Sequence, residues 1–234
     1  NVLGCYNPDV NLRTPHLDRL AGDGMRFERA YTTCPLCTPA RGGLFTGLMP
    51  SINGAHTNNL APGWNIPHLG QMFERAGYHT AFSGKWHLDG LDYFDSGICP
   101  PGWDAAYWYD GRRYLDDLSD EHIALWRQGL KTPDEIRKHG VGEEWTWAHR
   151  VSDLGIKFLK RRRQDRPFLL CLSYDEPHGP SVSPADYLER FEGFEFPIGP
   201  GAGDDLKDKP EHQREWAEAL GLPDSNGICR RDHY

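Results

Sequence analysis

The sequence predicts an α/β fold, in which helices cover both faces of a mostly parallel sheet. Two apolar runs, 78–83 and 168–174, are typical of buried strands. Each run follows a segment with helical character, 66–77 and 143–163 respectively. The order helix, strand, helix, strand favours parallel strands, because parallel neighbours need a long crossover that a helix supplies.

The first helix is expected after Thr14, whose hydroxyl can cap it while Pro15 takes the first position. It should end near Gly24. A second helix is expected from about Ile66 to Gly77, since glycine suits the left-handed position that ends a helix. The following run then enters the sheet as a strand.

The segment 143–163 has the clearest helical periodicity. Its apolar residues recur every three or four positions: Trp147, Val151, Leu154 and Phe158. Pro167 ends it before the second strand. The basic run 160–163 lies at the C-terminal end, where cations complement the helix dipole, which favours a solvated helix end over a nucleic-acid patch.

Residues 92–142 do not follow this alternation of helices and strands. We interpret them as an insertion near the mouth of the candidate functional site. They hold many aromatic residues: Tyr93, Trp103, Tyr107, Trp108, Tyr109, Tyr114 and Trp126. Flat rings could stack on a sugar or aryl group, but for any single residue we favour packing against the sheet. The Gly-, Pro- and Asp-rich segment 193–210 is expected to be a surface loop.

Composition narrows the classes of function. The 234 residues carry a formal net charge of −8, which argues against a nucleic-acid partner. No apolar run is long enough for a membrane-spanning helix. The six cysteines show no spacing typical of a disulfide scaffold.

The most informative motif is Cys37-Thr38-Pro39-Ala40-Arg41, followed by Gly-Gly-Leu-Phe-Thr-Gly at 42–47. A plain reading is a partly buried cysteine in a turn before a helix. A second reading pairs Cys34 with Cys37 as a redox dithiol or half a zinc site. No second pair completes a zinc site, and a redox dithiol leaves the pattern from Arg41 to Gly47 unexplained.

Two further motifs follow the two expected strands. Gly-Lys-Trp-His-Leu occupies 84–88, and Pro-His-Gly-Pro occupies 177–180. Open α/β sheets bind their ligands at the carboxyl ends of the strands. We therefore expect Lys85, His87 and His178 to converge with Arg41 around one anion-sized pocket.

In this order and spacing, the three motifs resemble the signatures of the type I, formylglycine-dependent sulfatases. The resemblance covers most of 1–90 and returns at about 143–180. It implies the alkaline-phosphatase-like α/β fold, and it makes 1–234 look like an internal fragment of the N-terminal catalytic domain. Many sulfatases are exported, so the resemblance favours a periplasmic or extracellular location over others.

The resemblance implies that a maturation enzyme oxidises Cys37 to formylglycine. The hydrated aldehyde would be the nucleophile that attacks the sulfur of a sulfate monoester, such as a carbohydrate or aryl sulfate. Its second hydroxyl would then expel sulfate. A phosphonate or phosphate ester hydrolase of the same superfamily is the nearest alternative, and a catalytically silent binding protein with unmodified Cys37 is another.

The family also implies roles for the other motif residues. Arg41 would hold the diol, and Lys85 would bind a sulfate oxygen and neutralise charge as the ester bond breaks. His87 has an ordinary pKa range suited to moving a proton near neutrality. His178 would contact the sulfate and protonate the departing alcohol, although the sequence leaves open which histidine is acid and which is base.

The resemblance implies a calcium ion, with residue 37 as formylglycine among its ligands. Calcium prefers six to eight oxygen ligands, and in the family these include paired aspartates that follow a strand. We expect the remaining ligands outside 1–234. The pair Asp232-His233 is not adopted as a substitute, because residues 229–231 do not form an apolar strand.

The motif generates a direct prediction about residue 37. In full-length protein matured with a compatible converting enzyme, peptide mass spectrometry should find formylglycine there, lighter than cysteine. Cys37→Ala should fold but lose turnover of a sulfate ester. Near wild-type turnover by Cys37→Ala would rule out the diol mechanism.

Overall fold

The computed structural model describes residues 3–9, 12–130, 132–179, 182–191, 193, 194, 204 and 206–220. The expected loop 193–210 lies largely outside these residues, as do Pro180, Asp232 and His233. The chain divides into two units, Asn1–Ala30 with Phe191–Tyr234, and Tyr31–Arg190. Among the described residues, the helices are too short or too polar to cross a lipid bilayer.

The first unit contains α1 (Pro15–Asp23) and α10 (Glu211–Leu220). The helix expected after Thr14 is confirmed, with Pro15 in its first turn. Thr14 does not cap the helix with its side chain. Its hydroxyl accepts from Gly4 N at 2.9 Å and donates to Asp18 Oδ1 at 2.9 Å, which ties the preceding turn to the helix.

The second unit is built on two parallel strands, β1 (His79–Gly84) and β2 (Phe168–Ser173). The strands pair in register along their whole length, from His79 with Phe168 to Gly84 with Ser173. The remaining elements of this unit are α2 (Cys37–Thr46), α3 (Pro50–Asn53), α4 (Leu69–Arg75), η1 (Ala105–Tyr107), α5 (Gly111–Asp116), α6 (Asp120–Gln128), α7 (Pro133–Lys138), η2 (Glu143–Trp145), α8 (Trp147–Arg161) and α9 (Ala185–Glu189).

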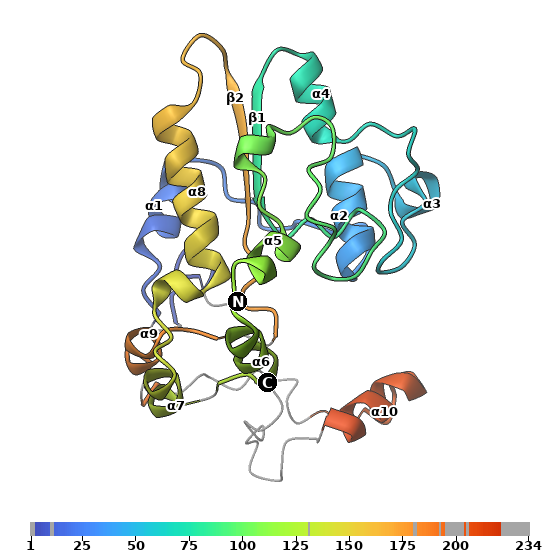
Figure 1. Ribbon diagram of the computed structural model, residues 1–234. Helices are drawn as coiled ribbons and strands as arrows, with labels where there is room; N and C mark the ends of the chain where they lie inside the picture. Colours follow the sequence, from blue (N-terminus) through green and yellow to red (C-terminus); the bar gives the residue numbers. More distant parts are fainter. Residues whose placement is uncertain are drawn as a thin grey trace. The chain divides into compact units, whose positions relative to one another are not determined.

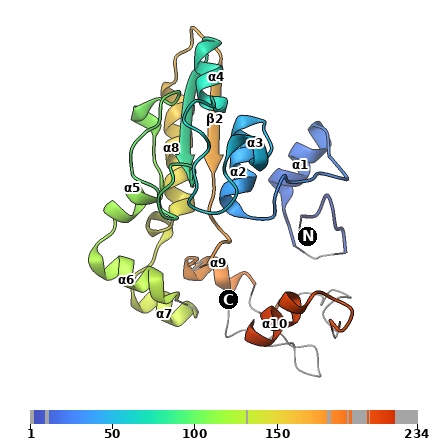
Figure 2. The ribbon, with the colours of Figure 1, turned by 90° about the vertical axis from the view of Figure 1, so that its right-hand side faces the viewer.

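Helices cover both faces of the strand pair, as the sequence predicts. On one face, Phe158 of α8 clusters with Ala81 and Leu170. On the other face, Phe45 of α2 packs edge-on against Phe82, with ring centroids 5.9 Å apart. Neighbouring strand residues point to opposite faces, so Ala81 and Phe82 face different helices. Figures 1 and 2 show α8 on one side of the strands and α2 with α4 on the other.

Two helices begin later than the sequence predicts. The helix expected from Ile66 begins at Leu69, because His68 and Gln71 form a reciprocal capping box at that point. The helix expected from 143 is divided. Thr146 accepts a hydrogen bond from His149 N and caps α8, while the residues before it form the short helix η2.

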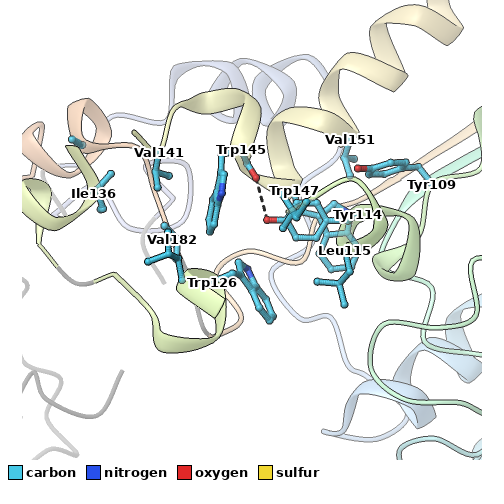
Figure 3. Packing of buried hydrophobic residues seen from close by; sticks show 13 residues of the cluster. Tyr109, Tyr114, Leu115, Trp126, Ile136, Val141, Trp145, Trp147, Val151 and Val182 are labelled. Atoms are coloured by element: carbon cyan, nitrogen blue, oxygen red, sulfur yellow. Dashed lines mark hydrogen bonds between the residues drawn. The ribbon is translucent and has the colours of Figure 1, made fainter. Parts of the chain in front are cut away.

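The aromatic residues of 92–142 mostly pack inside the unit. Six of the seven singled out in the sequence are buried: Trp103, Tyr107, Trp108, Tyr109, Tyr114 and Trp126. In the main cluster, Tyr114 stacks on Trp147 at 5.4 Å between ring centroids and donates to Trp145 O at 3.1 Å (Figure 3). This core joins residues 92–142 to the N-terminal end of α8.

The end of β1 generates a stability prediction. Gly84 has φ = 111°, and a Cβ there would lie 2.0 Å from Ser173 O. Gly84→Ala should therefore lower the free energy of unfolding by about 3 kcal/mol or more, since it combines a left-handed backbone with a clash against the neighbouring strand. Urea unfolding of the protein measures the loss.

Gly77→Ala provides the matched control. Gly77 also has a left-handed φ, of 87°, but a Cβ there would meet no atom within 4 Å. Only the backbone strain of about 1–2 kcal/mol should remain. Equal losses in the two variants would show that the contact with Ser173 does not constrain position 84.

Candidate active site

Cys37 is the first residue of α2, and Leu36 before it is extended. The N-terminus of a helix carries the positive end of the helix dipole. An anion next to residue 37 is therefore stabilised before any side chain contributes. Thr38 and Pro39 behind it are fully buried, and Thr38 N donates to Asn58 Oδ1 at 3.0 Å, which fixes the start of the helix.

Arg41 lies one turn after Cys37 and joins α2 to the ends of both strands. Its Nε donates to Trp86 O at 2.6 Å, and its Nη2 donates to Lys85 O. Nη2 also donates to Ser173 Oγ at 2.9 Å. Burial lowers the pKa of Arg41, because the charged guanidinium loses hydration there. The side chain is held mainly by backbone oxygens that follow β1, so its role in this structure is to fix the position of α2.

The two glycines after Arg41 are required by close packing. A Cβ on Gly42 would lie 3.1 Å from Ala55 Cβ, and a Cβ on Gly43 would lie 2.4 Å from Thr33 Oγ1. Larger residues would push α2 away from the segments that flank it. The small residues of the motif therefore serve the placement of Cys37.

Lys85 follows β1 directly and is buried with its partner Asp175, which follows β2. Its Nζ lies 3.2 Å from Asp175 Oδ1 and 3.9 Å from Cys37 Sγ. The backbone N–H of Lys85 donates to Ser173 O at 2.9 Å, which extends the ladder between the strands by one residue. Lys85 and Cys37 thus lie close together, as expected. Asp175 is a further residue of this site that the sequence analysis did not name.

His87 is buried, and its Nε2 donates to Asn59 Oδ1 at 2.8 Å. Both residues have left-handed backbones, with φ = 54° at His87 and 63° at Asn59. Burial, followed by the neighbouring charges of Lys85 and Arg41, lowers the pKa of His87 to about 4. The sequence led us to expect an imidazole that titrates near neutrality. In this environment His87 is neutral at pH 7.

His178 lies on the exposed side of the same site, after β2. Its ring centroid is 4.7 Å from that of Tyr93, and its Nδ1 is 2.8 Å from Gly179 O. The site therefore contains a buried neutral histidine and an exposed one.

Tyr93 is one of two site residues, with Asp175, that the sequence did not single out as such. Lys85 Nζ lies 3.9 Å from its ring centroid, and the ring of His87 is 5.4 Å away. The phenol donates to Asp175 Oδ1. Tyr93 thus contacts all three expected side chains that follow the strands: Lys85, His87 and His178.

Different signals bear on the two missed residues. Asp175 lies two residues after the end of β2, so the rule that ligands bind at the carboxyl ends of strands would have selected it. Tyr93 is one of many aromatic residues in 92–142, and no spacing sets it apart. Only the contact between distant segments identifies it.

The described residues do not provide a metal site. No three or more His, Cys, Asp or Glu side chains among them are grouped so that they could hold a metal ion. The carboxylate of Asp175 is already paired with the ammonium group of Lys85. The described residues therefore do not form a calcium site by themselves.

The sequence is similar to a known protein family over most of its length. The sequence model of the family described as Sulfatase matches residues 3–202. An uncharacterized sulfatase, YidJ of Escherichia coli K12, is 50% identical over 224 residues, which are 95% of this chain and 45% of that protein. The chain thus spans about half or less of the length of the curated relatives it matches.

Solved structures share the fold. A structure described as a complex with its substrate D-glucosamine-2-N,6-O-disulfate aligns with a TM-score of 0.62 and 24% identity, over 87% of this chain and 37% of that one. A phosphonate monoester hydrolase from Silicibacter pomeroyi aligns with a TM-score of 0.63 and 18% identity, over 88% of this chain and 46% of that one. These likenesses confirm the expected α/β fold.

The burial of His87 generates a prediction about pH. Its folded pKa of about 4 lies below the ordinary value of 6.5, so between these values the unfolded chain binds more protons. The stabilising contribution is complete above pH 6.5 and is lost as the pH falls toward 4. His87→Gln should remove up to about 3 kcal/mol of this dependence in urea unfolding across the window.

His56→Gln is the control, because His56 is exposed in the same unit. It should leave the pH dependence of unfolding close to that of the wild type. An NMR titration of the His87 ring with a midpoint near 6.5 would contradict the buried neutral state.

Proposed function

Because the chain belongs to the sulfatase family, we propose that the protein hydrolyses a sulfate monoester at the site around Cys37. The observation that carries the proposal is the approach of Lys85 Nζ to Cys37 Sγ, at 3.9 Å, where residue 37 begins a helix. A cation and a helix N-terminus directed at one reactive position form a site for an anionic group. The rest of the proposal assigns the surrounding residues.

We assign residue 37 as the nucleophile in its formylglycine form, which a maturation enzyme would produce. When formed, this group would supply a hydroxyl that attacks sulfur and a second hydroxyl that permits sulfate release. Arg41 positions it indirectly, through hydrogen bonds that hold α2 against the strand ends. Preorganised positioning of this kind lowers the barrier without any movement during the reaction.

Lys85 is assigned to the transferred sulfate group. Its ammonium is buried and already oriented by Asp175 and by the ring of Tyr93. Negative charge develops on the oxygens around sulfur as the ester bond breaks, and a fixed cation in a water-poor site stabilises that charge strongly. Asp175 and Tyr93 are then positioning residues for Lys85.

The two histidines divide the proton transfers in this proposal. His87 is neutral at pH 7 and has an unpartnered Nδ1 among the described residues, so this nitrogen is open to accept a proton, with the low basicity that burial imposes. His178 is exposed beside Tyr93, so it can reach the departing alcohol and protonate it. In this assignment the buried His87 is the base and the exposed His178 is the acid.

The substrate class is a carbohydrate or aryl sulfate. The disulfated glucosamine complex of a structural neighbour makes a sugar sulfate the first choice. Calcium stays part of the proposal as the metal typical of the family, with residue 37 in its formylglycine form as one ligand. The shared fold of the phosphonate monoester hydrolase makes an ester of phosphorus the comparison substrate.

Turnover by the full-length, matured protein separates these reactions. An aryl sulfate and the matching aryl phosphonate share a leaving group, so their kcat/KM ratio reports the preferred central atom. A higher value for the sulfate supports the proposal. A higher value for the phosphonate would transfer the assignment to phosphonate hydrolysis, and turnover of neither would favour a silent binding protein.

Substitution of Lys85 gives a quantitative prediction. Lys85→Ala should lower kcat/KM for an aryl sulfate by about 30-fold or more, which corresponds to about 2 kcal/mol, the scale of one preorganised contact to a developing charge. Lys160→Ala removes an exposed lysine from the end of α8 and should leave kcat/KM unchanged.

The single variant leaves Asp175 buried without its partner, which can destabilise the fold by itself. The double variant Lys85→Ala with Asp175→Asn removes that charge and should fold, yet it should remain as slow as the single variant. Recovery of wild-type turnover in the double variant would contradict a role for Lys85 in binding sulfate.

A further inference from the structure

A cavity of about 290 Å³ lies beside the site, between the start of α8 and the segment that leads to α9. Its walls include Glu143, His149, Glu176 and Tyr187. The volume is close to the lower limit of small-molecule sites, about 300 Å³. It therefore suits a single ring-sized group.

The segment after β2 contributes residues both to the proposed site and to the cavity wall. Asp175 of this segment pairs with Lys85, and His178 contacts Tyr93, while Glu176 between them lines the cavity. A smaller hollow of about 10 Å³ is lined by Asp175, Glu176 and His178, and it shares Glu176 with the cavity. Glu176 is two residues from His178 in sequence, so the segment that carries His178 also forms part of the cavity wall.

The charges around the cavity are negative. Glu143 and Glu176 contribute carboxylates, and no Lys or Arg occurs among the described residues that line it. Glu176 Oε1 accepts from Ala148 N at 3.0 Å, while Oε2 is buried without a partner among the described residues. Tyr187 donates to Glu143 Oε1 at 2.5 Å, which leaves Glu143 Oε2 3.7 Å from His149 Nδ1.

We propose that this cavity binds the alcohol part of the substrate and selects a hydroxyl-rich group that carries an amine over one that carries a second anion. The inference rests on the proposed function, because it assumes that the alcohol side of the scissile ester lies next to His178. A protonated amine would pair with the carboxylates of Glu143 and Glu176. An additional sulfate or a carboxylate would meet like charges there, with no cation to compensate them.

Binding of the desulfated sugars to the full-length protein tests this without any turnover. D-glucosamine, titrated by saturation-transfer NMR, should bind more tightly than D-glucuronate. Glu143→Gln and Glu176→Gln should each raise the Kd for D-glucosamine by about fivefold. This is the upper range for the loss of a partly exposed ion pair. Each Gln keeps the shape of the side chain and its ability to accept a hydrogen bond.

Glu144→Gln is the matched control, since Glu144 is the neighbour of Glu143 and does not line the cavity. It should leave D-glucosamine affinity unchanged. Equal affinity for the two sugars, no detectable binding, or an equal loss in Glu144→Gln would overturn the inference.

A parallel assay with an aryl sulfate, whose leaving group has no amine, separates the two hypotheses. Its kcat/KM should be nearly the same in Glu144→Gln and the wild type. Absence of turnover in the wild type, with the binding pattern intact, would refute the proposed function and retain an amine-binding site.

Discussion

The hydrogen bonds of Arg41 are the constraint on which the site depends. One side chain of α2 reaches the carbonyl oxygens of Lys85 and Trp86 and the hydroxyl of Ser173. These three residues follow or end the two strands, so the helix and both strands meet at one buried group. The distance between residue 37 and the ammonium of Lys85 follows from this arrangement. Because two of the acceptors are backbone atoms, the attachment does not depend on which side chains occupy 85 and 86.

Burial also determines the net charge around the guanidinium group of Arg41. Lys85 is compensated by Asp175, whereas Arg41 has no carboxylate within hydrogen-bonding distance among the described residues. Burial raises the pKa of Asp95 to about 8, so this nearby carboxyl group supplies little negative charge at pH 7. Burial, followed by the positive charges of Lys85 and Arg41, lowers the pKa of His87 and keeps it neutral. A site that retains excess positive charge in a buried setting is prepared for an anionic ligand.

The sequence predicted much of this arrangement and missed a definable part. The strands, α8 and the approach of Lys85 to Cys37 followed from periodicity and from the strand-end rule. Local capping moved the starts of α4 and α8, because hydrogen bonds of His68 and Thr146 decide where those helices begin. The roles of Tyr93 and Asp175 and the neutral state of His87 depend on contacts between segments far apart in the chain. A pattern in one segment carries no information on such contacts.

The burial of α2 has a consequence for the timing of maturation. Thr38 and Pro39 have no accessible surface to offer once α2 is packed, and the contact of Arg41 with Ser173 spans 132 residues of sequence. Contacts of that separation form only after most of the chain has been made. An enzyme that recognises residue 37 through its neighbours can therefore reach them only while this region is unfolded. Oxidation of the cysteine and folding of the second unit would then compete in time, and slower folding would give the more completely modified protein.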